Sequence, residues 1–176
     1  MAALVFLRVL PLLTTSSYLT FTIAEDLYFK PYLEPSVVGV ADHLLPSYIT
    51  VWYNRGMTLI SIIYPLTWCT AIVDLPVAHL WHTSIAAFVL YLLGLLFSIA
   101  HMLWGPQAMN LLNSTKKQDS SGITEIPRRW CRMNLIRGAL VDVPAWGCFL
   151  AGFLVWESAR WPESHLGTRL RLYHFS

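Results

Sequence analysis

Long apolar segments that are almost free of charge constrain this chain more than any other feature of its sequence. Residues 83–104 contain only His101 as a group that titrates near neutral pH, and residues 138–156 contain only Asp142 as a charged one. Each segment is long enough to cross a bilayer, because about 20 apolar residues in a helix span the hydrocarbon core. A helix also satisfies its own backbone hydrogen bonds, which lipid cannot do. The sequence therefore predicts an integral membrane protein.

The composition supports this class. Of the 176 residues, 56% are hydrophobic and only 12% are charged, whereas about 25% are charged in ordinary soluble domains. The spans and their links take up nearly the whole chain, so we expect one membrane domain over residues 1–176 and no separate soluble domain. The net charge of +2 is small and the basic residues are scattered, so nucleic acid is not an expected partner.

Four membrane spans are predicted, at residues 2–24, 50–73, 83–104 and 134–156. Residues 25–47 carry three prolines and four acidic side chains and are expected to form an ordered loop at the interface. Residues 107–129 are expected to form a polar loop, and residues 157–176 an amphipathic tail that lies on the membrane surface or frays. The predicted fold is an all-α, four-transmembrane-helix up-and-down bundle. The endoplasmic reticulum is the default membrane for such a chain, and a homo-oligomer is compatible with it.

The alternating direction of four spans has a consequence for the ionisable residues. The ends of the first and third spans and the starts of the second and fourth should lie near one membrane face. The polar residues that this rule gathers are Glu25, Asp26, Asn54, Arg55, His101, Asn134 and Arg137. A polar cluster of both charge signs above an apolar interior predicts a ligand pocket.

The start of the fourth span carries three candidate groups. Asn134 and Arg137 are three residues apart and share a helix face, so together they can bind one anionic oxygen. The alternative is that Arg137 snorkels to the interface and Asn134 caps the helix. Asp142 lies roughly 140° around an α-helix from Arg137 at 100° per residue, so its partner is expected on another helix. We expect a structural ion pair or a protonated, hydrogen-bonded acid there before a catalytic one.

Two further candidates lie on the second and third spans. Arg55 is expected to pair with Glu25 or Asp26 as a structural contact. His101 is the natural proton acceptor of the cluster, because its unperturbed pKa is near neutral. The alternative for His101 is a hydrogen-bonded histidine in the core or at the interface.

Metal and redox motifs are not evident. His79 and His82 are three apart near a turn, but no third ligand is near them in the sequence, so we expect no metal. Cys69, Cys131 and Cys148 are not in a metal-binding or CxxC spacing and are interpreted as buried small hydrophobic residues.

Scattered motifs around the spans resemble those of a known family. These positions are Trp52, Tyr53, Gly56 and Pro65 in the second span, Pro106 and Asn110 after the third, and Trp130, Asn134, Arg137 and Pro144 at the fourth. The pattern resembles the anthrone oxygenase family, small four-span proteins common in fungal polyketide clusters. The family tends toward Pro-Thr-Asn after the third span, where this chain has Pro106-Gln107-Ala108-Met109-Asn110.

The resemblance implies oxidation of an anthrone-like aromatic polyketide by O2 without metal, flavin or haem. A deprotonated polyphenol can pass an electron to O2, so the protein has to supply a base and positive charge beside the oxyanion. The roles implied are His101 as proton acceptor, Asn134 and Arg137 as oxyanion stabilisers, and Arg55, Asp142, Trp52, Tyr53 and Asn110 as substrate-binding or electrostatic support. The competing hypothesis is a non-enzymatic four-span scaffold or carrier for a lipophilic metabolite.

Overall fold

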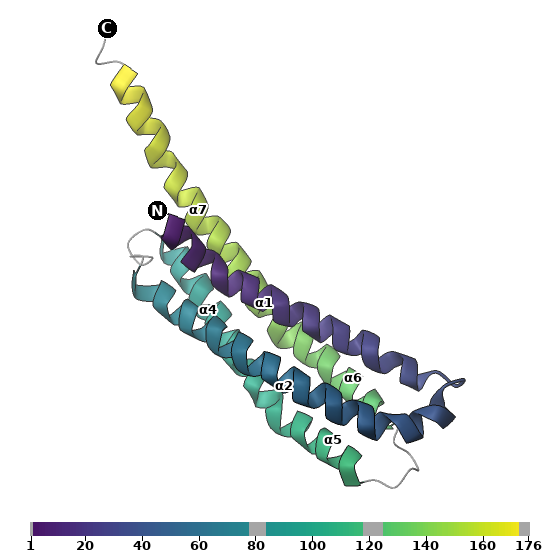
Figure 1. The fold of residues 1–176 in the computed structure, drawn as a ribbon. Coiled ribbons are helices and arrows are strands. Elements are labelled where there is room, and N and C mark those ends of the chain that lie inside the picture. The colour runs from purple at the N-terminus through teal and green to yellow at the C-terminus, as the bar shows by residue number, and fades with distance from the viewer. Residues whose placement is uncertain (1, 78–83, 118–124, 173–176) are drawn as a thin grey trace.

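The computed structural model describes residues 2–77, 84–117 and 125–172, which are helical almost throughout. Figure 1 shows them as long helices packed in alternating directions, with the start of the first helix and the end of the last one at the same end of the bundle. The helices are α1 (Ala2–Phe29), α2 (Val38–Val77), α4 (Ile85–Ala100), α5 (Gly105–Lys117), α6 (Glu125–Arg137) and α7 (Val143–Leu172). Four stretches are long and apolar enough to cross a membrane: Ala2–Leu33, His43–Pro76, Ile85–Ser114 and Glu125–Ala159. The all-α, four-span prediction is confirmed.

Helices occupy much of the two segments that were expected to be loops. α1 continues to Phe29, a 3₁₀ turn follows at Lys30–Leu33, and α2 already begins at Val38. Likewise, α5 and α6 cover most of residues 107–129. The loop predictions overestimated proline as a helix breaker, since Pro106 and Pro127 stand in the first turns of α5 and α6. At those positions the missing N–H has no helical partner to lose.

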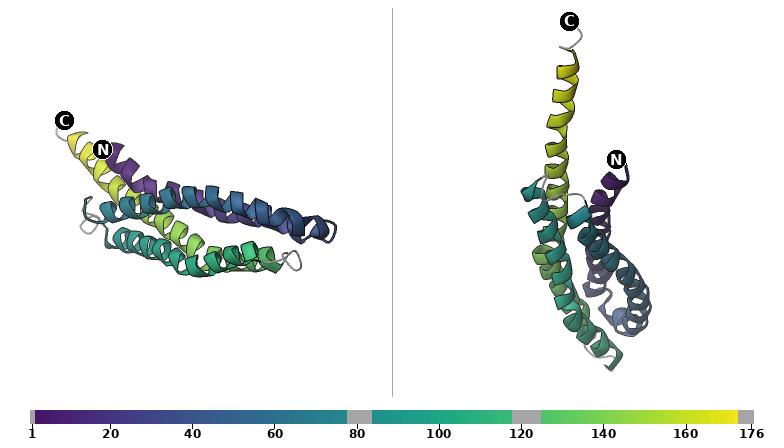
Figure 2. Two further views of the ribbon diagram at one scale, coloured as in Figure 1. Left: turned by 60° about the horizontal axis from the view of Figure 1, so that its bottom comes forward. Right: turned by 90° about the vertical axis from the view of Figure 1, so that its left-hand side faces the viewer.

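The predicted tail is helical and forms the C-terminal part of α7. This helix runs without a break to Leu172 and extends past the rest of the bundle in Figure 1 and in the right-hand view of Figure 2. The side chains beyond residue 159 lie outside the described ones, so the amphipathic contact with a membrane surface stays a prediction. The predicted turn with His79 and His82, and residues 118–124 of the predicted polar loop, also lie outside the described residues.

Glycines set the close contact between α4 and α7, which pack extensively against each other. A Cβ atom on Gly152 would lie 2.8 Å from Cδ2 of Tyr91, and one on Gly94 would lie 3.0 Å from the Phe149 ring. Small residues allow membrane helices to approach in this way. The packing of α4 on α7 fixes the third span against the fourth.

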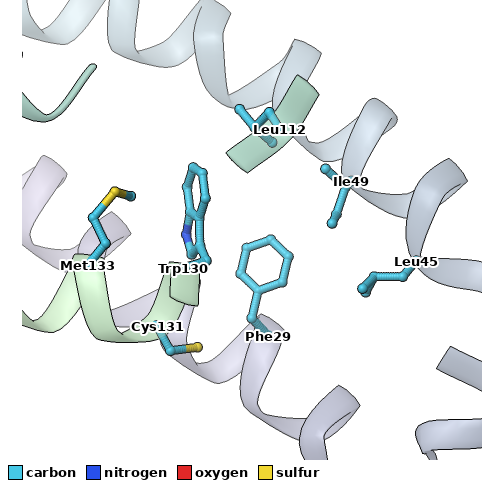
Figure 3. Packing of buried hydrophobic residues seen from close by; sticks show 7 residues of the cluster. All are labelled: Phe29, Leu45, Ile49, Leu112, Trp130, Cys131 and Met133. Atoms are coloured by element: carbon cyan, nitrogen blue, oxygen red, sulfur yellow. The ribbon is translucent and has the colours of Figure 1, made fainter. Parts of the chain in front are cut away.

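An aromatic and aliphatic core fills the bundle end away from the chain termini. Its buried members are Phe29, Leu45, Ile49, Leu112, Trp130, Cys131 and Met133. Figure 3 shows the rings of Phe29 and Trp130 between the helices that carry the other side chains. Trp130 also meets Trp52 edge to face, with ring centroids 5.5 Å apart. This core fixes α6 against α1 and α2.

The cysteines differ from the expectation in one case. Cys131 is buried and Cys148 is partly buried, but Cys69 is exposed on α2. The second span presents its outer face to lipid, and a cysteine on that face has no need of burial because lipid is as apolar as the protein interior.

Candidate active site

The structure brings together four of the predicted polar residues. His101, Asn134, Arg137 and Asp142 are all buried, with exposed fractions of 6%, 1%, 6% and 0%. The alternative in which Arg137 snorkels and Asn134 caps a helix is therefore wrong. Ionisable groups at membrane depth are costly and tend to mark functional sites.

His101 is held between two other spans. It begins the 3₁₀ turn His101–Trp104 after α4, and its Nδ1 lies 2.7 Å from Oδ1 of Asp142. The hydroxyl of Tyr64 on α2 lies 2.7 Å from Nδ1 and 2.9 Å from Nε2. When Nδ1 carries a proton it donates to Asp142, and Nε2 is then left to accept from Tyr64. These contacts hold the imidazole between the second and fourth spans.

Arg137 is held by a second set of contacts. Its Nη2 donates to Oε2 of Glu25 at 2.9 Å and also to the side-chain oxygen of Asn134. The amide nitrogen of Asn134 in turn donates to the backbone oxygen of Thr22 at 2.6 Å. Both buried groups on α6 are thereby fixed against α1.

A π-helical turn places Arg137 and Asp142 on one side of the fourth span. Residues Gly138–Asp142 form this turn, in which the N–H of Val143 donates to the oxygen of Gly138. Nε of Arg137 lies 3.8 Å from Oδ2 of Asp142. The expectation that they point apart assumed 3.6 residues per turn, and the wider π turn overturns it. The expected partners on other helices are also present, since Thr22 Oγ1 donates to Asp142 Oδ2 at 2.9 Å.

The charges of the cluster can be counted. Glu25 and Asp142 are two carboxylates, Arg137 is one fixed cation, and His101 is the remaining titratable group in contact with them. Nearby Asp26 is matched by Lys30 at 2.6 Å. Buried clusters avoid net charge, so neutrality calls for one mobile proton on the imidazole or on a carboxylate. The charge count therefore calls for one bound proton in the cluster.

A cavity of about 130 Å³ adjoins this cluster. Its polar end is formed by Glu25, His101 and Arg137. Its walls are largely aromatic and include Phe21, Trp52, Tyr53, Trp104 and Trp130. Helices α1, α2, α5 and α6 all contribute to the lining. An apolar chamber with a few convergent polar groups is the usual form of a small-molecule site.

Two predicted site residues lie elsewhere. Arg55 is exposed and borders a shallow hollow with Tyr28 and Leu59. The pairing of Arg55 with Glu25 or Asp26 is wrong, because those carboxylates bind Arg137 and Lys30. The other residue, Asn110, borders a hollow on the other side of Trp104.

By contrast, Trp52 and Tyr53 line the cavity as expected. The Tyr53 hydroxyl also lies 2.9 Å from Sδ of Met109 and so connects α2 to α5. Within the described ranges, no three His, Cys, Asp or Glu side chains are placed to hold one metal ion.

Tyr64 and Thr22 join the cluster without having been predicted, and Glu25 was expected only as a structural partner. The sequence did contain a signal for the two α1 residues, since Thr22 and Glu25 are three apart and share a face. Tyr64 carried no such signal, because one aromatic residue inside an apolar span is unremarkable.

Known fungal proteins are similar to this chain over most of its length. "Probable epoxidase scpX" of Mollisia scopiformis is 35% identical over 156 residues, which covers 88% of this chain and 98% of that protein. "Epoxidase pydX" of an Acremonium species is 32% identical over 84% of this chain and 92% of its own. This chain belongs to their family. "Epoxidase gkaX" of Penicillium citrinum, 28% identical over 82% of this chain and 90% of that protein, extends the similarity.

Membership of this epoxidase family refines the resemblance seen in the sequence. The expectation of an oxidising enzyme among small fungal membrane proteins agrees with these relatives, which are named epoxidases and not anthrone oxygenases. No family model matches the chain. No solved structure matches it either.

Proposed function

We propose that this chain is a membrane-embedded epoxidase that oxidises an apolar, unsaturated metabolite in the cavity beside His101. One observation carries the proposal: an aromatic chamber within the spans ends on a buried network of Glu25, His101, Arg137 and Asp142. The relatives' names supply the reaction class, and the chamber supplies the kind of substrate. We take the membrane to be that of the endoplasmic reticulum.

The walls favour a lipophilic substrate that enters from the bilayer. Met57, Met102 and Met109 line the chamber and are also exposed on the outer surface. All three lie within stretches able to span the membrane, so their exposed sides face lipid. Flexible thioether side chains adapt to ligands of different shape, which suits an entrance for a membrane-dissolved hydrocarbon chain or polyketide.

Epoxidation assigns a task to the polar end. One oxygen atom of O2 adds across a carbon–carbon double bond and the other leaves as water, while two electrons and two protons are consumed. A two-electron donor, such as a reduced flavin or nicotinamide, supplies the electrons. The cluster of this chain passes its mobile proton from His101 to the departing oxygen. Arg137 stabilises the negative charge that develops there as the O–O bond breaks.

A second candidate is the anthrone-type oxidation that the motif around Trp130, Asn134 and Arg137 favours. In that reaction a CH2 group and O2 give a carbonyl group and water, so the substrate itself supplies all four electrons that reduce O2. His101 then acts first as the base that removes the substrate proton. The two candidates differ in their need for an external reductant, which makes them separable by stoichiometry.

O2 uptake by detergent-purified protein tests the function. The substrate panel consists of unsaturated polyketides and anthrone-type polyphenols, each with and without reduced flavin. Epoxidation predicts donor-dependent uptake with the alkenes and incorporation of one atom from isotopically labelled O2. Donor-free oxidation of a polyphenol identifies the second candidate. The carrier hypothesis is favoured if the protein consumes no O2 with any substrate of the panel and if deletion of its gene in the producing host leaves the identity of the products unchanged.

Substitutions connect the activity to the chamber. Arg137→Leu should abolish turnover in protein that still accumulates, whereas Arg129→Leu should not, because Arg129 is exposed on the same helix and pairs with Glu125. Gly56 lines the chamber, and a Cβ there would lie 3.4 Å from Phe21. Gly56→Leu should therefore fill the space and reduce turnover. Gly39→Leu on the same helix is the control, because no described atom lies within 4 Å of its Cβ position.

A further inference from the structure

The interior face of α1 is polar. Of its eight buried residues, only Pro11 and Phe29 lack a polar group, and the others are Arg8, Thr14, Thr15, Tyr18, Thr22 and Glu25. Side chains spaced by three, four and seven residues share one side of a helix. The face of the first span that would ordinarily form an apolar core therefore presents hydroxyls and charges along most of its length.

The second and third spans continue this polar face. Tyr64, Thr67, Thr70 and Asp74 are all buried on α2 and have spacings that place them on one side of the helix. Ser98 is buried on α4 one turn before His101 and accepts a hydrogen bond from Trp68 at 3.1 Å. Tyr18 stacks on Tyr64 with ring centroids 4.7 Å apart. Polar groups of three spans thus meet between the helices and reach His101.

The far end of this polar face is a buried ion pair. Nε of Arg8 lies 3.7 Å from Oδ1 of Asp74, and both side chains are fully buried. The Arg8 guanidinium lies 5.5 Å and 5.1 Å from the ring centroids of Tyr91 and Trp156. Asp74 is two residues from the end of the second membrane-spanning stretch. The pair therefore lies near the membrane face opposite the cavity.

The polar atoms of this pair lack hydrogen bonds to the described part of the chain. Among the described residues, none of the three guanidinium nitrogens of Arg8 and neither carboxylate oxygen of Asp74 has a hydrogen-bond partner. Buried polar atoms are nearly always bonded, and ordered water commonly completes them. Five such atoms around one ion pair, within the described residues, therefore favour a site that water can reach.

We propose that the polar faces of α1, α2 and α4 form a water-accessible proton route from the Arg8–Asp74 pair to His101 and Asp142. The ten residues from Asp74 to Tyr64 correspond to about 15 Å along the helix at 1.5 Å per residue. In the proposed route, the side-chain hydroxyls of Thr67, Thr70 and Ser98 line this distance and are joined by bridging waters. The two threonine hydroxyls donate to backbone oxygens of their own helix and can still accept from water. Chains of such groups carry protons in membrane proteins. The catalytic use of the route rests on the proposed function, since epoxidation by O2 takes up two protons.

The accessibility of the route to water is tested without any enzyme assay. Cys69 is exposed toward lipid and lies two residues from buried Thr67 on the same helix. Two full-length variants are compared, and in both of them Cys131 and Cys148 are replaced by alanine. One variant carries Thr67→Cys together with Cys69→Ala, and the other retains Cys69 and Thr67. Proteoliposomes are treated with silver ions for increasing times, denatured, and labelled with a maleimide. The maleimide label measures the fraction of thiols that silver has not blocked.

If the route exists, silver ions should block the thiol of the Thr67→Cys variant at least about tenfold faster than they block Cys69. The reason is that thiols ionise and react only where water reaches them. Equal rates would overturn the proposal. Should Thr67→Cys fail to accumulate, Ser98→Cys takes its place with the same expectation.

A second experiment examines proton delivery in turnover. The pair Thr67→Val and Thr70→Val removes two hydroxyls, whereas Thr67→Ser and Thr70→Ser retains them. With an active substrate from the uptake panel, the valine pair should slow turnover several-fold and increase the solvent deuterium isotope effect, and the serine pair should restore both. An unchanged isotope effect contradicts a role in proton delivery. The silver-ion result is independent of this outcome and of the proposed reaction.

Discussion

His101 on the third span and Asp142 on the fourth lie 2.7 Å apart, Nδ1 to Oδ1, and both are buried. Neither residue is near the other in the sequence. Their contact joins α4 to the π turn before α7, at the polar end of the aromatic chamber. A carboxylate in contact with a buried histidine stabilises the protonated form of the imidazole, which suits a residue that transfers a proton.

His101→Gln should reduce product formation about 10²- to 10⁴-fold, the usual contribution of a positioned acid or base. Glutamine keeps hydrogen-bonding capacity but cannot exchange a proton near neutral pH. Product is quantified by mass spectrometry and normalised to the amount of protein in the membrane fraction. His43→Gln is the matched control, because His43 is exposed on α2 and does not line the cavity. Equal activity of the two variants would contradict a proton-transfer role for His101.

Thr22→Val should lower the free energy of unfolding by about 1.5–3 kcal/mol, the range for a hydrogen bond to a charged group. The change preserves shape but removes the hydroxyl that donates to Asp142 at 2.9 Å. Unfolding is followed in detergent by circular dichroism. Thr20→Val serves for comparison, because its exposed hydroxyl only donates to the backbone oxygen of Ser16. A Thr22→Val protein as stable as Thr20→Val would show that the hydroxyl is unimportant for Asp142.

Arg137→Leu should cost about 3–5 kcal/mol of stability, because it leaves the carboxylates of Glu25 and Asp142 without their cation. Adding Glu25→Gln removes one of those charges and leaves Asp142 with His101. The double variant should therefore be more stable than Arg137→Leu alone, although it remains inactive. Thermal unfolding midpoints of the two proteins in detergent, followed by circular dichroism, provide the measurement. A further loss of stability in the double variant would refute the charge count.

Gly152→Ala should destabilise the bundle by about 1–3 kcal/mol, as overpacking of a tight interface does. The new methyl group would lie 2.8 Å from the Tyr91 ring, whose hydroxyl donates to the backbone oxygen of Arg8 at 2.8 Å. Gly147→Ala is the control on the same helix, since no described atom lies within 4 Å of its Cβ position. The comparison uses thermal unfolding in detergent. Similar midpoints for the two variants would mean that α4 and α7 are not closely packed there.

The sequence identified the candidate residues better than it placed them. His101, Asn134, Arg137 and Asp142 stood out because charge and amide groups are costly in lipid. Arg55 stood out for the same reason but is exposed. The next residue, Gly56, lines the cavity. Successive residues point about 100° apart on a helix, so grouping by membrane depth alone could not separate them.

By itself, the sequence determined that the chain is a four-span helical membrane protein, because the length of uncharged apolar segments decides what can lie in a bilayer. The tertiary structure decided which polar groups meet. The π turn at Gly138–Asp142 rotates Asp142 toward Arg137, and the packing of α1 against α6 brings Glu25 to the same place. Helix rotation and local changes of pitch depend on contacts between distant segments, which hydropathy along one chain does not contain.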